Sequence, residues 1–501
     1  MSDAVSAVDG PGRRAAWWAA ALTLLGAALY FWRIGAQGLW YDEAVTALRV
    51  TRSLAVIWRA DPFIGPLHEV LLHFWVLMAG TSEAGLRSLS ALFAVASIPL
   101  FYVLARRLIA PRAAMVATVL FAVSPFTIFF AQEARQYALL MLLTIGAMLA
   151  FERGVRTRGR GAWVALALLN AALLYTHSYA VFVLLVQAVG LIIFRRNGGR
   201  SAVRQWLGSL IVSVALFGPR IPAVIWAASY AGLGRHALPL LKVPFTFLVF
   251  SVGYNAVPMN AETRLDYLSA VLDAWPFLAA VLVGFGLALI LGWRIGERTP
   301  SGRLLLLWCF LPALIVFVLA RFIPAIAAER YFVITFPAFV MLIALGIARP
   351  TWPARAAGVI IVVVLAAALH RYYLQPERYR WKDDWPTTVK VAGRMGGDRI
   401  LFLSRSVPAG FLYYAAAEVA GAAVALPPLT KEREIERALA GVQRVVLIES
   451  ISHEPEFSRP LHWLERHGDR VARPATIPYG DGQRVSLWVI RPGGVRAAGE
   501  D

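Results

Sequence analysis

The sequence predicts a polytopic α-helical membrane protein with a small α/β domain at its C-terminal end. Its 501 residues are 59% hydrophobic and only 16% charged, whereas soluble domains are about a quarter charged. The apolar residues gather in segments of about 20, the length that crosses a bilayer as a helix. After residue 370 the pattern changes to short apolar strands alternating with helix-like segments, which is typical of an α/β domain.

We predict about eleven membrane-spanning helices from the apolar segments. The polar residues Thr176, His177 and Ser178 interrupt the stretch 161–194, which we interpret as two short spans joined by a tight turn. The predicted spans are 15–34, 85–105, 113–131, 135–152, 161–176, 179–194, 206–229, 268–292, 303–320, 331–348 and 354–370.

The distribution of arginine predicts the orientation of these spans. Every second connection is basic, and these connections lie on the same side as Arg13 and Arg14, as the positive-inside bias requires. This bias places the N-terminus in the cytoplasm and the C-terminal domain outside. It also accounts for the net charge of +19 without a nucleic-acid surface, which would need a basic patch on a soluble face. The basic connections contain Arg106, Arg107 and Arg112; Arg153, Arg156, Arg158 and Arg160; Arg195, Arg196, Arg200 and Arg204; Arg294, Arg298 and Arg303; and Arg349 and Arg355.

Three regions follow from this topology. Residues 1–14 form a cytoplasmic tail, 15–370 the membrane domain with a large outer loop over 35–84, and 371–501 an extracytoplasmic α/β domain. Within the outer loop, residues 66–80 have helical apolar spacing but are too short to span, which predicts a helix at the membrane interface. The single cysteine, Cys309, lies in an apolar segment and is interpreted as a packing residue.

An acidic pair, Asp42 and Glu43, follows the first predicted span by only a few residues. Trp40 and Tyr41 precede it and tether it at the interface, where aromatic rings are favoured. Charged groups near the bilayer are costly and are often functional, so this pair is the first candidate site. A solvated pair in an ordinary loop is the alternative.

Further charged or titratable residues return to the same outer side from distant spans. Glu133 and Arg135 lie between two apolar segments, where an ordinary helix start is the alternative interpretation. Arg330 begins a late span and is suited to hold a phosphate, unless it only snorkels to the interface. His177 and His68 lie at turns and are either structural or part of a substrate site.

Five segments carry a resemblance to a known family. They are GLWYDEA (38–44), PLHEVLLHFWVLMAGTSEAGLRSLSALFAVASIPLFYVLARRL (66–108), SPFTIFFAQEARQYALLMLL (124–143), LLYTHSYAVFVLL (173–185) and ERYFVITFPAFVML (329–342). In this order they resemble the bacterial GT-C glycosyltransferases, in the branch related to protein O-mannosyltransferases and the lipid A aminoarabinose transferase. The resemblance covers most of residues 20–350, and WKDDW (381–385) resembles the start of the outer domain of these proteins.

The resemblance implies a reaction and a cellular location. The donor is a sugar on a polyprenyl phosphate, transfer inverts the sugar carbon, and the site faces the outside of a bacterial inner membrane. The acceptor is a hydroxyl on a glycan, a lipid or a protein. No nucleotide sugar is needed, which agrees with the lack of any P-loop or Rossmann glycine pattern in the sequence.

The resemblance also implies roles for the candidate residues. Asp42 maps onto the base, with Glu43 orienting it or coordinating a metal; Glu133 maps onto the second acidic motif. Arg330 maps onto the outer arginine, which together with Arg135 would neutralise the leaving phosphate. His68, His177 and Tyr41 would contact donor or acceptor.

No cofactor is required by this interpretation, and a divalent metal held by Glu43 and Glu133 is left open. Gln132 stands beside Glu133 where some relatives have a second acid, which weakens the case for a metal there. Two other functions stay open from the sequence: a transporter or flippase of lipid-linked sugars, and a polysaccharide polymerase or ligase. A transporter would more naturally show charges at mid-membrane and a repeated half.

Overall fold

The computed structural model describes residues 11–59, 64–157, 159–230, 242–256, 267–322, 328–379, 382–450, 458–471, 474–477 and 483–491. The described residues form two compact units. The first comprises residues up to 34 together with 50–256 and 275–370; the second comprises 35–49, 257–274 and 371–501.

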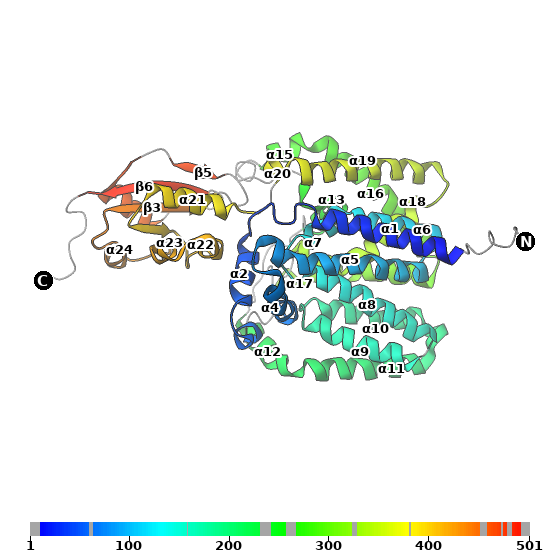
Figure 1. Ribbon diagram of the computed structural model, residues 1–501. Coiled ribbons are helices and arrows are strands. Elements are labelled where there is room, and N and C mark those ends of the chain that lie inside the picture. Colours follow the sequence, from blue (N-terminus) through cyan, green and yellow to red (C-terminus); the bar gives the residue numbers. More distant parts are fainter. Residues whose placement is uncertain are drawn as a thin grey trace, which may run out of the picture. The chain divides into compact units, whose positions relative to one another are not determined.

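The first unit is built of helices, seen in Figure 1 as the coiled ribbons α1 and α3–α19 apart from α15. Their bounds are α1 Pro11–Phe31, α3 Leu54–Arg59, α4 Leu67–Ala79, α5 Glu83–Leu108, α6 Pro111–Val123, α7 Pro125–Ala131, α8 Tyr137–Thr157, α9 Arg160–Leu174, α10 Ala180–Ile193, α11 Arg195–Phe217, α12 Ile221–Tyr230, α13 Lys242–Val252, α16 Trp275–Gly296, α17 Pro300–Leu319, α18 Phe336–Ile347 and α19 Trp352–Leu374, with short 3-10 turns η1 Gly218–Arg220, η2 Gly253–Asn255 and η4 Glu329–Ile334.

Each predicted span overlaps one or more helices, although the span predicted over 331–348 begins in the 3-10 turn η4 and the span predicted over 268–292 includes most of α15, which belongs to the second unit. Within the described residues, six helices are long and apolar enough to cross a membrane, or seven if α6 and α7 form one span bent by 49°. Pro125 begins α7 and Ser124 caps it, which explains the break. The stretch 161–194 divides into α9 and α10, as predicted. The remaining predicted spans are shorter helices, so the total of eleven stays a prediction.

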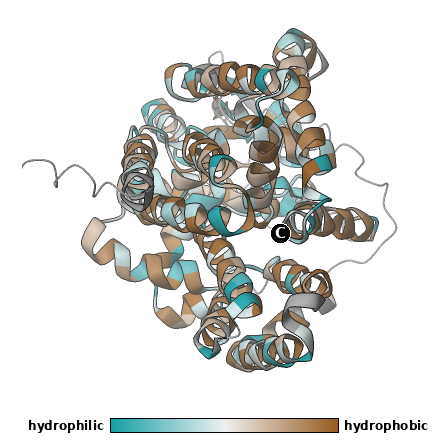
Figure 2. Ribbon diagram, turned by 90° about the vertical axis from the view of Figure 1, so that its right-hand side faces the viewer, coloured by the Kyte–Doolittle hydropathy of each residue, from teal (hydrophilic) through white to brown (hydrophobic). Residues whose placement is uncertain are grey.

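Apolar side chains also cover much of the outside of this unit. Figure 2 looks along many of its helices and shows mostly brown, hydrophobic ribbon. Leu24, Ile211 and Leu282 are 71%, 68% and 74% exposed. A protein surrounded by water rarely exposes so continuous an apolar surface, so the first unit is a membrane domain.

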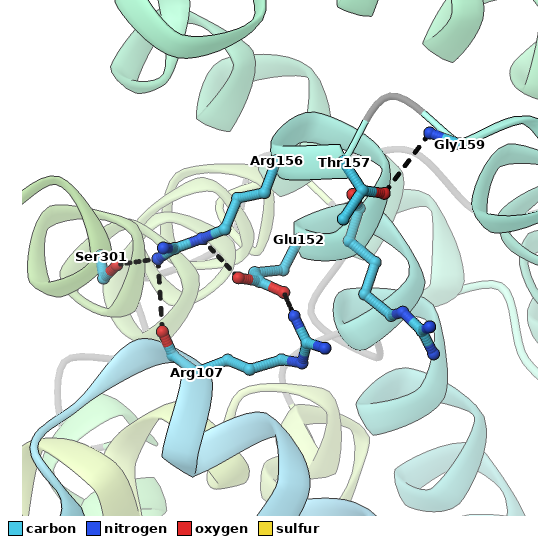
Figure 3. Close-up of polar contacts among 7 residues, drawn as sticks. Arg107, Glu152, Arg156, Thr157, Gly159 and Ser301 are labelled. Atoms are coloured by element: carbon cyan, nitrogen blue, oxygen red, sulfur yellow. Dashed lines mark hydrogen bonds and ion pairs between the residues drawn. The ribbon is translucent and has the colours of Figure 1, made fainter.

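One end of the unit carries the arginine-rich connections (Figure 3). The buried carboxylate of Glu152, near the end of α8, pairs with Arg107 of α5 at 3.1 Å and with Arg156 one turn further along α8. Arg156 also donates to the Ser301 hydroxyl at the start of α17. Three connections that the positive-inside bias assigned to one side therefore contact one another.

The second unit contains the C-terminal sheet together with several helices. The helices are α2 Tyr41–Val50, α15 Tyr267–Asp273, α20 Pro376–Tyr379, α21 Trp385–Met395, α22 Ala409–Tyr414, α23 Ala417–Gly421, α24 Glu432–Ala438 and α25 Arg459–His467. The strands are β1 Arg399–Phe402, β2 Ala423–Ala425, β3 Arg444–Ser450, β4 Gly468–Arg470, β5 Ala475–Ile477 and β6 Gln483–Ile490.

The sheet is mixed and has the order β2-β1-β3-β6-β4, with β5 paired to β6. β1 is parallel to both β2 and β3, and β6 is antiparallel to its neighbours. Alternate residues of β1 and β3 point to opposite faces. Leu401 and Leu447 pack with α24 and α25, whereas Phe402 and Ile448 pack with α21 and α22. The predicted small α/β domain is therefore confirmed, with its sheet between two helical layers.

Candidate functional site

The turn before α8 brings two predicted site residues into the interior of the first unit. Glu133 and Arg135 lie in a tight turn, in which the Arg135 amide donates to the Glu133 carbonyl at 2.8 Å. Both side chains are buried, with 1% and 5% of their surface exposed. The turn lies at the opposite end of α8 from Glu152. Since α8 has 21 residues, about 30 Å of helix separates the two charged clusters.

A second connection places His68 beside this turn. The Leu67 amide donates to the Tyr175 carbonyl at 3.0 Å, so the start of α4 docks onto the end of α9. Gly65 makes this approach possible, because a Cβ there would lie 1.9 Å from the same carbonyl oxygen. His68 is buried, and burial, with the nearby Arg135 charge, lowers its pKa to about 3.

His177 lies in the turn between α9 and α10, and its hydrogen bond defines its tautomer. The Tyr179 amide donates to Nδ1 at 3.1 Å, so the ring proton of the neutral form is on Nε2. Burial, together with the charges of Arg135 and Arg330, lowers the pKa of His177 to about 3. The ring also lies 6.4 Å from that of Tyr137 and 4.8 Å from that of Tyr331, measured between centroids.

Arg330 reaches the same cluster from η4. Its charge acts on His177 and on the Tyr137 hydroxyl, which also experiences Arg135 and Glu133. Next to Arg330, the carboxylate of Glu329 accepts a 3.3 Å hydrogen bond from the buried Tyr254 hydroxyl. The structure thus brings together five predicted site residues from four connections: His68, Glu133, Arg135, His177 and Arg330.

The cluster contains buried polar groups to which the described residues offer no hydrogen-bond partner. Among the described residues, His68 Nε2, His177 Nε2 and the Tyr137 hydroxyl have no hydrogen-bond partner. Buried polar groups are nearly always paired, so several orphaned ones beside two arginines indicate a ligand with many acceptor oxygens. Tyr137 and Tyr254 were not predicted as site residues, because a tyrosine at the edge of an apolar segment looks like an ordinary interface residue.

The structure also explains why Gln132 replaces an acid. Its amide nitrogen donates to the carbonyls of Leu29, Tyr30 and Trp32 at 3.4, 3.1 and 2.9 Å, which satisfies the last turn of α1. A carboxylate has no proton to donate and would face the negative end of the helix. Glutamine at this position is therefore a helix-capping residue.

The acidic pair belongs to the second unit, where its two members have different surroundings. Asp42 is half-buried in the first turn of α2, whereas Glu43 is fully buried and pairs with Lys382 at 3.0 Å. The segment before them is also anchored there, because the Leu39 amide donates to the Tyr414 hydroxyl at 2.8 Å. The Glu43–Lys382 pair thus anchors α2, the helix that carries Asp42. Lys382 was not predicted, although it lies in the WKDDW segment.

Breaking this buried pair should destabilise the second unit strongly. Lys382→Met removes the cation that pairs with the buried Glu43 carboxylate, which we expect to cost about 3–5 kcal/mol. The double variant Glu43→Gln/Lys382→Met removes both charges and should recover much of this loss. Thermal unfolding of the purified protein in detergent measures both. A double variant no more stable than Lys382→Met would show that the pair is not the source of the effect.

The residues predicted for a metal do not form a ligand set in the described part of the chain. The Glu43 carboxylate is held by the Lys382 ammonium group, which is an alternative to a metal ion. Within the described ranges, no group of three or more His, Cys, Asp or Glu residues is arranged to hold a metal ion. Metal dependence stays a prediction for experiment.

The two buried histidines predict a pH dependence of stability. Both are neutral in the fold, with pKa values of about 3, and they regain ordinary values near 6.5 on unfolding. Below pH 6.5 the unfolded chain binds protons that the folded chain excludes, so stability falls as the pH falls. We expect a loss of about 1.4 kcal/mol per pH unit for each histidine between pH 6 and 4.

Melting temperatures of the wild type and of His177→Gln between pH 8 and pH 4 check this expectation. The variant should show a shallower decline, whereas His462→Gln, at an exposed histidine, should follow the wild type. Equal slopes for the wild type and His177→Gln would contradict the buried, neutral state of His177.

Comparisons with known proteins concern the family match and the fold. A family model described as dolichyl-phosphate-mannose-protein mannosyltransferase matches residues 62–226, which contain His68, Glu133, Arg135 and His177. No curated protein matches the sequence significantly.

Three solved structures share the fold at low sequence identity. ArnT from Cupriavidus metallidurans in the apo state has a TM-score of 0.56 at 12% identity, over 95% of this chain and 98% of that one. The same protein bound to undecaprenyl phosphate has a TM-score of 0.54 at 12% identity, over 94% and 98%. The archaeal oligosaccharyltransferase AglB from Archaeoglobus fulgidus, in complex with an inhibitory peptide and a dolichol-phosphate, has 0.51 at 12% identity, over 91% and 73%.

Fold and family match together define the class of the protein. It is a polytopic membrane protein with the architecture of the GT-C enzymes and a small C-terminal sheet. The resemblance inferred from its sequence is confirmed for the fold: the chain shares the fold of ArnT, and residues 62–226 match the family model of the protein mannosyltransferases.

Proposed function

We propose that this protein transfers a sugar from a polyprenyl-phosphate donor to an acceptor hydroxyl, with inversion, at the outer face of a bacterial plasma membrane. The observation that carries the proposal is the buried cluster of Arg135, Arg330 and orphaned donors at the end of α8 away from the arginine-rich connections. That end is the outer one by the positive-inside bias. The ArnT structure with undecaprenyl phosphate supports a lipid phosphate as ligand of this fold.

The cluster has the chemistry of a phosphate site. A guanidinium group can donate two parallel hydrogen bonds to phosphate oxygens, and here two such groups are available from separate connections. His177 presents a protonated Nε2 and Tyr137 a hydroxyl, both buried and lacking a partner in the described residues. Donors that are already in place and shielded from water stabilise charge as it develops on the leaving phosphate.

Asp42 is the proposed base. The acceptor hydroxyl forms the new bond to the anomeric carbon while its proton passes to the Asp42 carboxylate. The bond from that carbon to the phosphate oxygen breaks, and its electron pair leaves with the polyprenyl phosphate. The half-exposed side chain of Asp42 suits this role, because a base must contact the incoming acceptor hydroxyl. Glu43 suits it less, because its carboxylate is fully buried and paired with Lys382.

A donor panel tests the proposal. The purified full-length protein is incubated in detergent with radiolabelled polyprenyl-monophosphate sugars and membrane extract as acceptor. We expect one donor to lose its label and to release polyprenyl phosphate, which identifies the sugar; a parallel series with chelator tests metal dependence. Consumption of diphosphate-linked oligosaccharides only would favour a polymerase or ligase. If every donor stays intact but is flipped in liposomes, the proposal fails in favour of a transporter.

A further inference from the structure

The second unit contains a polar cavity of about 350 Å³ that the reaction described above does not use. It lies outside the carboxyl ends of β1 and β3, between the loop after Phe402 and the end of β3 at Ser450. A volume of this size falls in the lower part of the range for small-molecule sites.

The topology of the sheet favours a ligand at this position. β2 and β3 lie on opposite sides of β1, and the helices between the strands cover opposite faces, α22 on one and α24 on the other. The strand order therefore reverses between β1 and β3. Open α/β sheets bind ligands at such a switch point, in the crevice beyond the carboxyl ends of the strands.

The lining groups suit a hydroxyl-rich, uncharged ligand. Asp383 and Glu449 are each 9% exposed and supply carboxylate oxygens that accept hydrogen bonds from hydroxyls. Trp385 and the half-exposed Tyr41 supply aromatic rings, on which the apolar face of a sugar can pack. The two carboxylates outnumber the one lining arginine, the exposed Arg405, so the net charge of the lining repels an anion at short range.

We propose that this cavity binds a sugar unit of the acceptor, so that the acceptor is an uncharged glycan. The inference rests on the proposed transfer reaction and names its acceptor class. Tyr41 lines the cavity and Asp42, the proposed base, is the next residue. The Glu43–Lys382 ion pair also links the proposed base to the cavity. Glu43 directly follows Asp42, and Lys382 directly precedes the cavity residue Asp383.

Direct binding of simple glycosides to the full-length protein tests the cavity without the reaction. The probes are the methyl glycosides of mannose, glucose, galactose and arabinose, observed by saturation-transfer NMR in detergent without donor. Ser406→Trp places a large ring at an exposed lining position and should weaken binding at least about tenfold. Glu449→Gln should weaken it similarly, and Glu418→Gln, an exposed acid on α23, is the matched control.

The transfer reaction supplies a second readout. With a neutral glycan as acceptor, Ser406→Trp should raise the KM for the acceptor about tenfold while the KM for the donor stays within about twofold. Glycosides that fail to bind the wild type, or that bind Ser406→Trp as well as the wild type, overturn the cavity assignment. A third outcome is that Ser406→Trp abolishes glycoside binding but the wild type releases no polyprenyl phosphate. This outcome overturns the proposed reaction and supports the sugar site.

Discussion

Replacing Asp42 by asparagine should reduce sugar transfer by about a hundredfold or more while the affinity for the donor stays within about twofold. A positioned general base contributes about 10²–10⁴-fold, and asparagine cannot accept the proton of the acceptor hydroxyl. Asparagine fills nearly the same volume, and the Glu43–Lys382 pair that holds α2 stays intact. Initial rates of polyprenyl-phosphate release, with filter binding of labelled donor, measure the two effects separately.

Glu418→Gln is the control for this experiment, since it neutralises an exposed carboxylate of the same unit on α23. It should transfer at the wild-type rate. An Asp42→Asn variant that is folded and retains more than half of the wild-type rate would remove Asp42 from the mechanism.

Replacing Arg330 by alanine should lower kcat/KM for the donor about 10²–10³-fold, the effect typical of removing one group that stabilises developing charge. Arg330 is the second residue of η4, and its charge acts on His177 and Tyr137 in the buried cluster. Arg330→Lys should recover only part of the rate, because an ammonium group keeps the charge but cannot make two parallel hydrogen bonds to one phosphate. Unlike Asp42→Asn, Arg330→Ala should also weaken donor binding.

Arg355→Ala is the matched control, because Arg355 is an exposed arginine near the start of α19, in a connection predicted to face the cytoplasm. Its kcat/KM should equal that of the wild type. If Arg330→Ala binds and turns over the donor as the control does, the cluster is not the phosphate site.

Much of the fold was accessible from the sequence because its signals are local. A helix in lipid must satisfy its backbone internally, so apolar length alone reveals it, and the polar interruption at Thr176–Ser178 marks the turn between α9 and α10. The strands β1, β3 and β6 lie where short apolar segments predicted them. Arginine spacing likewise grouped the connections that meet around Glu152.

The functions of individual polar residues were less accessible, because they depend on partners far away in the chain. Asp42 and Glu43 are adjacent and chemically alike, yet Glu43 is fully buried and pairs with Lys382, 339 residues later, whereas Asp42 is half-buried. From the sequence, Gln132 suggests an acidic motif that has lost one of its acids. In the structure, its amide caps the end of α1, about a hundred residues earlier. In both cases the role of the residue depends on its tertiary contacts, and the same local sequence with other contacts would have another role.

By itself the sequence determined the class of protein, the order of its helices, the small C-terminal sheet and the set of residues worth testing. It did so because hydropathy and charge act through the local chain and the surrounding bilayer. Only the tertiary structure decided that His68, Arg135, His177 and Arg330 share one buried cluster with unsatisfied donors. It alone showed Glu43 as an anchor and a polar cavity at the β1–β3 boundary, because pairing and burial are properties of contacts between distant segments.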